Sequence, residues 1–282
     1  MAKVIGGIGA SHAPSILHAY DQGKSQEFPW KPLFDAYDPV RDWLSAQKVD
    51  TLVVIYNDHL NHFDLGTIPT FALGVGAQMK LARDGRHRKG LPPVDGHPEL
   101  AAHMADSLLR DEFDLTICHE MELDHGVMTT LPLLVQERWN VKVVPLAVNV
   151  IQEPLPTPRR CARLGEAIRK AVSSYPGSER VVVVATGGLS HQLHGPDFGE
   201  TNPEWDNRFL DLIQTNPEPL AVASHEDYMT RGGVESVEMM MWLVMRMAVG
   251  ANTAQLRQIQ RYYWAPLLTG YALLALECER YE

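Results

Sequence analysis

Three short runs of apolar, mostly β-branched residues constrain the fold of this chain more than any other feature. They are Thr51–Tyr56, Val141–Val150 and Arg180–Ala185. Runs of this length without polar alternation are typical of strands buried on both faces, as in parallel sheets covered by helices. We therefore expect a sheet with helices packed on both sides.

Segments with helical periodicity alternate with these runs. Further strands are predicted from Lys3 to Ile8 and from Phe113 to Ile117, and Tyr271–Leu276 is compatible with a strand or a helix. The predicted helices cover residues 32–47, 98–110, 127–136, 159–173, 204–214, 219–229 and 235–249. This alternation predicts an α/β fold with a mixed, largely parallel central sheet flanked by helices. No linker or composition break divides the chain, so residues 1–282 are expected to form one domain, with a surface loop at 83–96.

Composition excludes several classes of protein. The 282 residues can bury a core without disulfide bonds, and Cys118, Cys161 and Cys278 are expected to be buried thiols in a reducing compartment. The net charge of -10 is the wrong sign for a nucleic-acid partner. No apolar run reaches about 20 residues and no secretory signal is visible, so we expect a cytoplasmic protein without membrane contact.

Four histidines share one placement. Each follows a predicted strand by a few residues, in a turn flanked by Gly or Asp: His12, His59, His125 and His191. A single loop histidine is more often an ordinary polar residue, but ligands of α/β sheets bind beyond the carboxyl ends of the strands. We therefore expect these four imidazoles to converge on one pocket. The histidines without this placement are expected at the surface or at helix caps: His18, His87, His97, His103 and His225.

Two of these imidazoles could bind a metal together with a carboxylate. Two histidines and one carboxylate on one face of an octahedron form the facial triad of non-haem Fe(II) oxygenases. The candidate carboxylates, Glu235 and Glu238, lie on one face of a predicted helix. Glu235 suits the dipole of the first turn, whereas Glu238 lies deeper and suits a ligand. Asn57 and Asp58 could orient the ring of His59.

Five motifs taken together give the chain a family resemblance. They are Ser-His-x-Pro at His12, Val-Ile-Tyr-Asn-Asp-His at His59, Asp-His-Gly at His125, Thr-Gly-Gly-Leu-Ser-His-Gln at His191 and Val-Glu-x-x-Met-Trp at Glu238. In this order and spacing, the chain resembles the type III extradiol ring-cleaving dioxygenases, a family that includes the protocatechuate 4,5-dioxygenase β subunit. The resemblance extends from residue 1 to about 276.

The resemblance implies an Fe(II)-dependent enzyme that cleaves the ring of a catecholic substrate with O2, giving a muconic semialdehyde-type product. By resemblance, His12, His59 and Glu238 are the iron ligands. His191 is the catalytic base, and His125 acts beside the oxygen or substrate site. The implied substrate contacts are Asn57, His125 and Thr269.

One stretch departs from the family pattern. Residues 262–270 read Tyr-Tyr-Trp-Ala-Pro-Leu-Leu-Thr-Gly, where the family has small polar residues that help to hold a substrate carboxylate. The substrate therefore stays open among protocatechuate, gallate, 3-O-methylgallate and a catechol without a carboxylate. Some members of the family work with a small α subunit, so the resemblance implies such a partner and a homo- or hetero-oligomer.

Two other functions fit part of the same residue set. Histidine and glutamate ligands around zinc, with a bound water, would suit a metal-dependent hydrolase. A non-catalytic binding protein could use the same fold, because fold does not fix function. Replacing iron by zinc separates the two enzymes, since a hydrolase would work with zinc and a dioxygenase would not.

Overall fold

The computed structural model describes residues 1–84, 91–135, 140–250 and 256–278. In this part of the chain, eight strands form one sheet in the order β10-β11-β1-β9-β2-β8-β3-β6. Their bounds are β1 Lys3–Ala10, β2 Thr51–Tyr56, β3 Phe71–Gly74, β6 Thr116–Cys118, β8 Lys142–Val148, β9 Arg180–Thr186, β10 Leu256–Trp264 and β11 Tyr271–Cys278. The central strands β1, β9, β2 and β8 are parallel, whereas β11 runs antiparallel to β1 and β3 antiparallel to β8. The predicted mixed α/β sheet is confirmed.

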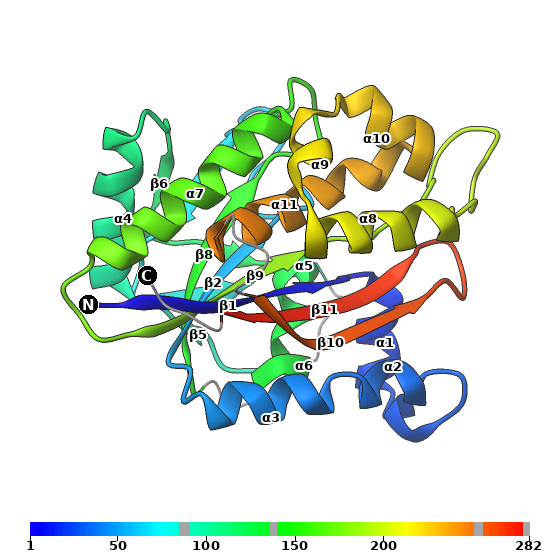
Figure 1. Cartoon of the computed structure of the whole chain (residues 1–282), viewed down its shortest axis with the longest axis horizontal. Helices are drawn as coiled ribbons and strands as arrows, with labels where there is room; N and C mark the ends of the chain where they lie inside the picture. Colours follow the sequence, from blue (N-terminus) through cyan, green and yellow to red (C-terminus); the bar gives the residue numbers. More distant parts are fainter. Residues whose placement is uncertain (85–90, 136–139, 251–255, 279–282) are drawn as a thin grey trace.

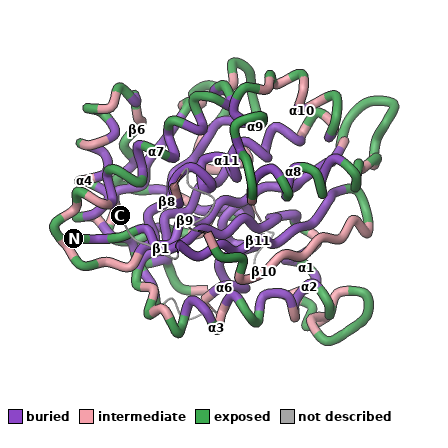
Figure 2. The backbone as a smooth tube through the Cα atoms, viewed as in Figure 1, coloured by how far each residue is buried: buried purple, intermediate pink, exposed green. Residues whose placement is uncertain are grey.

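Helices cover both faces of the sheet (Figure 1). One layer contains α4 Pro98–Arg110, α7 Pro158–Ser174, α8 Pro203–Thr215, α9 Glu218–Val222, α10 His225–Gly232 and α11 Met239–Ala248. The other contains α1 Pro14–Asp21, α2 Lys31–Asp35, α3 Asp38–Ala46, α5 His125–Met128 and α6 Leu131–Val135. The central strands between the layers are buried, as Figure 2 shows.

Strand β2 explains the unbroken apolar runs of the sequence. Its side chains alternate between the two cores, with Val53 and Ile55 in the core below α7 and α11 and Leu52, Val54 and Tyr56 in the opposite one. Successive side chains of a strand point to opposite faces, so a strand covered on both sides needs apolar residues throughout.

A second, small sheet lies beside the first. It consists of β4 Gln78–Leu81, β5 Val94–Asp95 and β7 Glu122–Leu123, in the order β5-β4-β7. Part of the predicted surface loop at 83–96 is therefore a strand with a buried Val94, and residues 85–90 of that loop, with His87, lie outside the described residues. Because β7 ends at Leu123, this sheet leads directly into Asp124 and His125.

Three predicted helices are each divided in two, and the residues at the break explain two of these divisions. The predicted helix at 32–47 is α2 followed by α3, because Pro39, in the first turn of α3, has no N–H to continue a helical ladder. The predicted helix at 219–229 is α9 followed by α10. Here Ser224 begins a new helix through a capping box with Asp227.

Other boundaries also differ from the predictions. The predicted helix at 127–136 is α5 and α6, and its last residue, Gln136, lies outside the described range. The predicted helix at 235–249 begins as a 3-10 turn, η2 Val234–Glu238, before α11. The ambiguous segment 271–276 lies in strand β11. Strand β10 was missed, because its polar and aromatic residues do not alternate cleanly.

Two composition-based expectations can be compared with the fold. Cys118, Cys161 and Cys278 are free and buried, as expected. Across the described ranges, none of the helices combines the length and apolar character needed to cross a bilayer.

Gly9 on β1 allows a close approach by α11. A Cβ atom at this position would lie 2.2 Å from the nearest carbon of the Trp242 ring. The indole Nε1–H of Trp242 in turn donates to the carbonyl of Gly187, at 3.2 Å, just after β9. The glycine therefore lets one buried tryptophan join β1 to the turn after β9.

We expect Gly9→Ala to lower the free energy of unfolding by about 1–3 kcal/mol, because the added methyl group overpacks a filled core. Urea denaturation followed by tryptophan fluorescence measures the change. Gly66→Ala is the control, because a Cβ there meets only the exposed Asp64 side chain. Equal stability of the two variants would contradict the packing argument.

Candidate metal centre and active site

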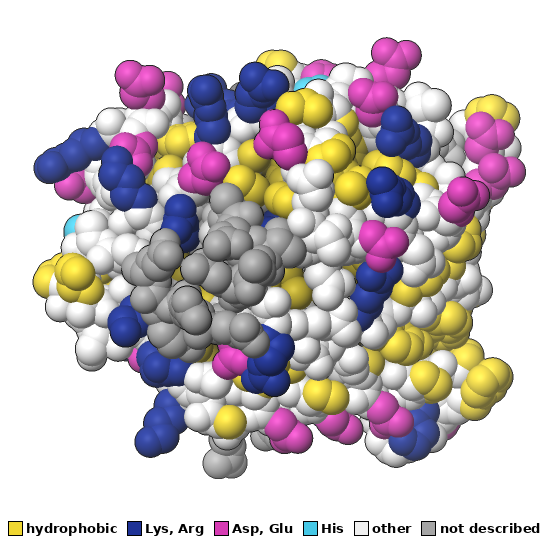
Figure 3. All heavy atoms as spheres, in the orientation of Figure 1, with side chains coloured by type: hydrophobic (Ala, Val, Ile, Leu, Met, Phe, Trp, Pro, Cys, Tyr) yellow, Lys and Arg dark blue, Asp and Glu magenta, His cyan; other side chains and the backbone are white. Residues whose placement is uncertain are grey.

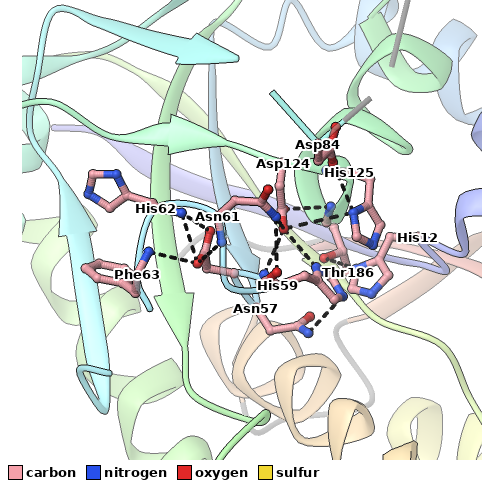
Figure 4. Close-up of polar contacts among 12 residues, drawn as sticks. His12, Asn57, His59, Asn61, His62, Phe63, Asp84, Asp124, His125 and Thr186 are labelled. Atoms are coloured by element: carbon pink, nitrogen blue, oxygen red, sulfur yellow. Dashed lines mark hydrogen bonds and ion pairs between the residues drawn. The ribbon is translucent and has the colours of Figure 1, made fainter. Parts of the chain in front are cut away.

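The candidate residues gather where parallel strands end. Strands β1, β2 and β9 end at the same edge of the sheet, and their following turns carry His12, His59 and His191. Glu238 comes from η2 at the start of α11, and His125 follows β7. Figure 4 shows the imidazoles of His12, His59 and His125 close together.

His12, His59 and Glu238 offer three ligand atoms that lie within 4.8 Å of one another. The Nε2 atom of His12 is 3.4 Å from Oε2 of Glu238, and the Nε2 atom of His59 is 3.9 Å from Oε1. The two rings meet edge to face, with centroids 5.0 Å apart. The structure therefore brings the three predicted ligands into one cluster.

The other nitrogen of each ring is held by a neighbouring side chain. Nδ1 of His12 lies 2.9 Å from the hydroxyl of Thr186, the last residue of β9. Nδ1 of His59 lies 2.9 Å from Oδ2 of Asp124 and donates to it (Figure 4). Such contacts fix the ring orientation of metal-ligating histidines, so both Nε2 atoms face the carboxylate of Glu238.

Asp124 is a buried carboxylate with four donors. It accepts from the backbone N–H of His59 at 2.8 Å, from the ring of His59, from Nδ2 of Asn61 at 3.1 Å and from the N–H of Gly126 at 2.8 Å. Burial raises the pKa of Asp124. The hydrogen bonds that Asp124 accepts from His59 and the charge of His59 outweigh this effect, so the pKa is lowered to about 2. Burial alone would lower the pKa of His59, but the hydrogen bond and the charge of Asp124 outweigh it, so the pKa of His59 is raised.

Glu238 is 7% exposed and stays ionised. Burial raises its pKa, but the charge and hydrogen bond of His12, with the charges of His191 and His59, bring the pKa well below its ordinary value. The N–H of Gly188 also donates to Oε2 at 2.7 Å. A buried carboxylate in this environment is suited to bind a cation.

Asn57 is fully buried and contacts two of the candidate ligands. Its Nδ2 lies 3.3 Å from Oε1 of Glu238 and 3.1 Å from Nε2 of His59. Its Oδ1 has no hydrogen-bond partner among the described residues. The predicted substrate contact at Asn57 therefore lies at the ligand cluster itself.

His191 presents one ring nitrogen to the cluster. Its Nδ1–H donates to the carbonyl of Leu189 at 2.8 Å, and its Nε2 is 3.8 Å from Oε2 of Glu238. This hydrogen bond leaves Nε2 of the neutral ring without a proton, so Nε2 can accept one. Thr269 forms an isolated bridge with His191, which places the third predicted substrate contact beside the predicted base.

His125 is held by Asp84, a residue that the sequence reading missed. Oδ2 of Asp84 accepts from the backbone N–H of His125 at 3.0 Å and from its Nδ1 at 3.2 Å. Burial lowers the pKa of His125 to about 4, against the opposite effect of Asp84. Asp84 lies in the predicted surface loop, and nothing in its neighbouring residues pointed to a partner 41 positions away.

The donor set fits a divalent metal ion. Two imidazole nitrogens and one carboxylate oxygen converge, and their remaining polar atoms are hydrogen-bonded. His59, Asp124 and His125 form a second close group, but Nδ1 of His59 and Oδ2 of Asp124 already bond each other. Glu235 instead accepts from the backbone of Leu193 and the ring of His194, away from this cluster.

Comparison with known proteins places the chain in a family. Residues 6–273 match the family model of the catalytic LigB subunit of aromatic ring-opening dioxygenase. The chain belongs to the LigB family. A crystal structure of the uncharacterized protein JW3007 from Escherichia coli K12 matches 97% of the chain and 99% of its own length, with a TM-score of 0.54 at 14% identity. That structure supports the fold of this LigB chain.

Curated relatives carry the names of ring-cleaving enzymes. A gallate dioxygenase of Pseudomonas putida is 45% identical over 199 residues, which cover 70% of this chain and 58% of that protein. A 2,3-dihydroxyphenylpropionate/2,3-dihydroxicinnamic acid 1,2-dioxygenase of Cupriavidus necator is 30% identical over 65% of this chain and 56% of its own length. This LigB chain therefore spans just over half the length of these relatives.

We expect Asp124→Asn to weaken the binding of a divalent metal about 10- to 100-fold, because the ring of His59 loses its orienting carboxylate. Titration calorimetry with Zn2+ or Fe2+ under anaerobic conditions measures the dissociation constant. Asp114→Asn, at an exposed aspartate, is the matched control. Unchanged affinity in Asp124→Asn would show that His59 needs no such partner.

The buried neutral ring of His125 gives stability a pH dependence. Its pKa is about 4 in the folded protein and about 6.5 when exposed, so the unfolded chain binds the proton first. The contribution of the neutral His125 ring to the free energy of unfolding is fully present above pH 6.5. This free energy declines by at most about 3 kcal/mol as the pH falls toward 4. In metal-free protein, His125→Gln should flatten the urea-denaturation free energy across this window. Parallel wild-type and variant curves would contradict the assignment.

Proposed function

We propose that the chain is an Fe(II)-dependent extradiol dioxygenase, which opens the ring of a catecholic substrate with O2. The observation that carries the proposal is the convergence of His12, His59 and Glu238, with His191 and His125 beside them. Membership of the LigB family and 45% identity to a gallate dioxygenase support it. Residues 1–282 would act as one catalytic domain, located in the cytoplasm.

The substrate that we favour is a gallate-type trihydroxybenzoate. The 45% identical relative supports this choice. The chain's own residues suit a phenolic substrate in general, because His191 and His125 both direct their donor nitrogen, Nδ1–H, away to protein oxygens. Each Nε2 is then an acceptor, and adjacent phenolic hydroxyl groups supply the matching donors.

His12, His59 and Glu238 would hold the iron. Bound there, Fe(II) would supply Lewis acidity that lowers the phenol pKa and a common centre for the ring and O2. Nε2 of His191 accepts a phenolic proton, while its Nδ1–H stays on the carbonyl of Leu189 and keeps the charged ring in place. Nε2 of His125 accepts a hydrogen bond from substrate, because Asp84 holds Nδ1.

A small α-type subunit is the protein partner in this proposal. Exposed apolar side chains occur near the site. Leu267 is 57% exposed and Leu268 is 40% exposed. Leu268 lies against Gly199, which directly follows the exposed Phe198. Figure 3 shows hydrophobic side chains gathered over the ends of β10 and α2. Such a surface near a polar site suits a protein cover that excludes water.

The test uses anaerobically iron-loaded protein, a panel of diols and an oxygen electrode. We expect gallate to give oxygen consumption with a coloured ring-opened product, and protocatechuate, 3-O-methylgallate and 2,3-dihydroxyphenylpropionate to be slower. His191→Ala should keep iron and lose at least about 100-fold in kcat, as expected for a general base. His12→Ala and Glu238→Ala should lose iron.

Two outcomes would overturn the proposal. The first is wild-type protein that binds iron but consumes no oxygen with any diol, alone or with an added small α-type subunit. The second is activity that is restored by zinc, because zinc has no redox chemistry and would indicate a hydrolase.

A further inference from the structure

The segment that carries His191 is attached to a buried carboxylate. Asp206, in the first turn of α8, is fully buried. It accepts the backbone N–H of Ser190 at 2.8 Å, the hydroxyl of Ser190 at 2.7 Å and the phenol of Tyr263 on β10 at 2.7 Å. Ser190 directly precedes His191, so Asp206 fixes the peptide from which the imidazole projects.

Two glycines let this segment be held so closely. A Cβ at Gly270 would lie 2.2 Å from Oδ2 of Asp206, and a Cβ at Gly233 would lie 2.1 Å from the carbonyl oxygen of His191. The N–H of Gly270 also donates to the carbonyl of Ser190 at 2.8 Å. Helix α8, the connection between β10 and β11, and the turn at Gly233 therefore enclose the segment from three directions.

The hydrogen bonds of Asp206 serve this segment rather than the joint between α8 and β10. Two of its three donors belong to Ser190. The same helix and strand are also joined at the surface, where Arg261 pairs with Asp211 at 2.6 Å. A buried carboxylate is costly unless it is fully hydrogen-bonded, so its use here needs a reason beyond attaching a helix to a strand.

The geometry points to Asp206 as a positioning residue for His191, which holds the base in line with the diol by clamping Ser190. This inference rests on the proposed function, in which His191 takes the proton. A misplacement of about 1 Å at a reacting group can cost about 100-fold in rate, so the clamp acts on turnover rather than on metal binding.

The experiment compares Asp206→Asn with Asp211→Asn, the same substitution on the same helix facing the same strand. In iron-loaded protein, we expect Asp206→Asn to lower kcat at least about tenfold with KM and bound iron unchanged. Asp211→Asn should stay within about twofold of wild type. Tyr263→Phe, which removes one donor and leaves both bonds to Ser190, should lose about two- to threefold.

A second readout is independent of turnover. In zinc-loaded, 15N-histidine-labelled protein, the wild-type His191 ring should show the Nδ1–H tautomer, assigned by its disappearance in His191→Gln. Asp206→Asn should show a mixture of tautomers. Should that variant fail to fold, Ser190→Ala removes the hydroxyl bond to Asp206 and keeps the backbone bond. Its kcat should be lower than that of Tyr263→Phe, with the same tautomer mixing.

Three results would overturn the inference. They are wild-type kcat in Asp206→Asn, a loss of bound metal that accounts for the fall in kcat, or an unchanged tautomer in both Asp206→Asn and Ser190→Ala. Wild-type protein without turnover would instead remove the proposed function, and the tautomer spectra would still decide whether Asp206 positions His191.

Discussion

The attraction between one buried carboxylate and the imidazoles around it organises the centre of this protein. Glu238 has little contact with water, and the imidazoles of His12, His59 and His191 surround its carboxylate at 3.4, 3.9 and 3.8 Å. Since a buried anion without partners is strongly unfavourable, the turns after β1, β2 and β9 must all deliver their histidines correctly. The fold below the site, with its rigid parallel strands, meets this demand.

The residues behind the imidazoles decide which nitrogen each one offers. Asp124, Asp84 and the carbonyl of Leu189 each take an Nδ1–H, and so His59, His125 and His191 all turn Nε2 inward. The protein therefore sets the proton positions of these rings through oxygens of Asp124, Asp84 and Leu189. In the proposed function, this arrangement gives one metal ligand, His59, and two hydrogen-bond acceptors, His125 and His191, from the same type of side chain.

Much of the fold and of the candidate site could be predicted from the sequence, because the signals lie in short stretches of neighbouring residues. The central strands and the turns that carry His12, His59 and His191 follow from apolar runs that end in Gly or Asp, because strand ends at one sheet edge converge. His125 lies in a turn of the same kind, but it follows β7 of the small sheet. Asp84 and Asp206 could not be found in this way. Each acts on a histidine segment through a contact distant in sequence, and an isolated acidic residue has no pattern that distinguishes it from a solvated one. Strand β10 was missed for a related reason, because it lies at the sheet edge and is only partly buried.

The candidate metal ligands come from the first strand, the second strand and the start of the last long helix. No local piece of the chain contains all three, and the parallel pairing that aligns them forms only when distant segments have met. Affinity for an ion at these three residues would therefore depend on the completed tertiary structure, and a bound ion would stabilise the folded chain rather than any one element. An ion held by His12, His59 and Glu238 would also join the turns after the first two strands to the start of α11.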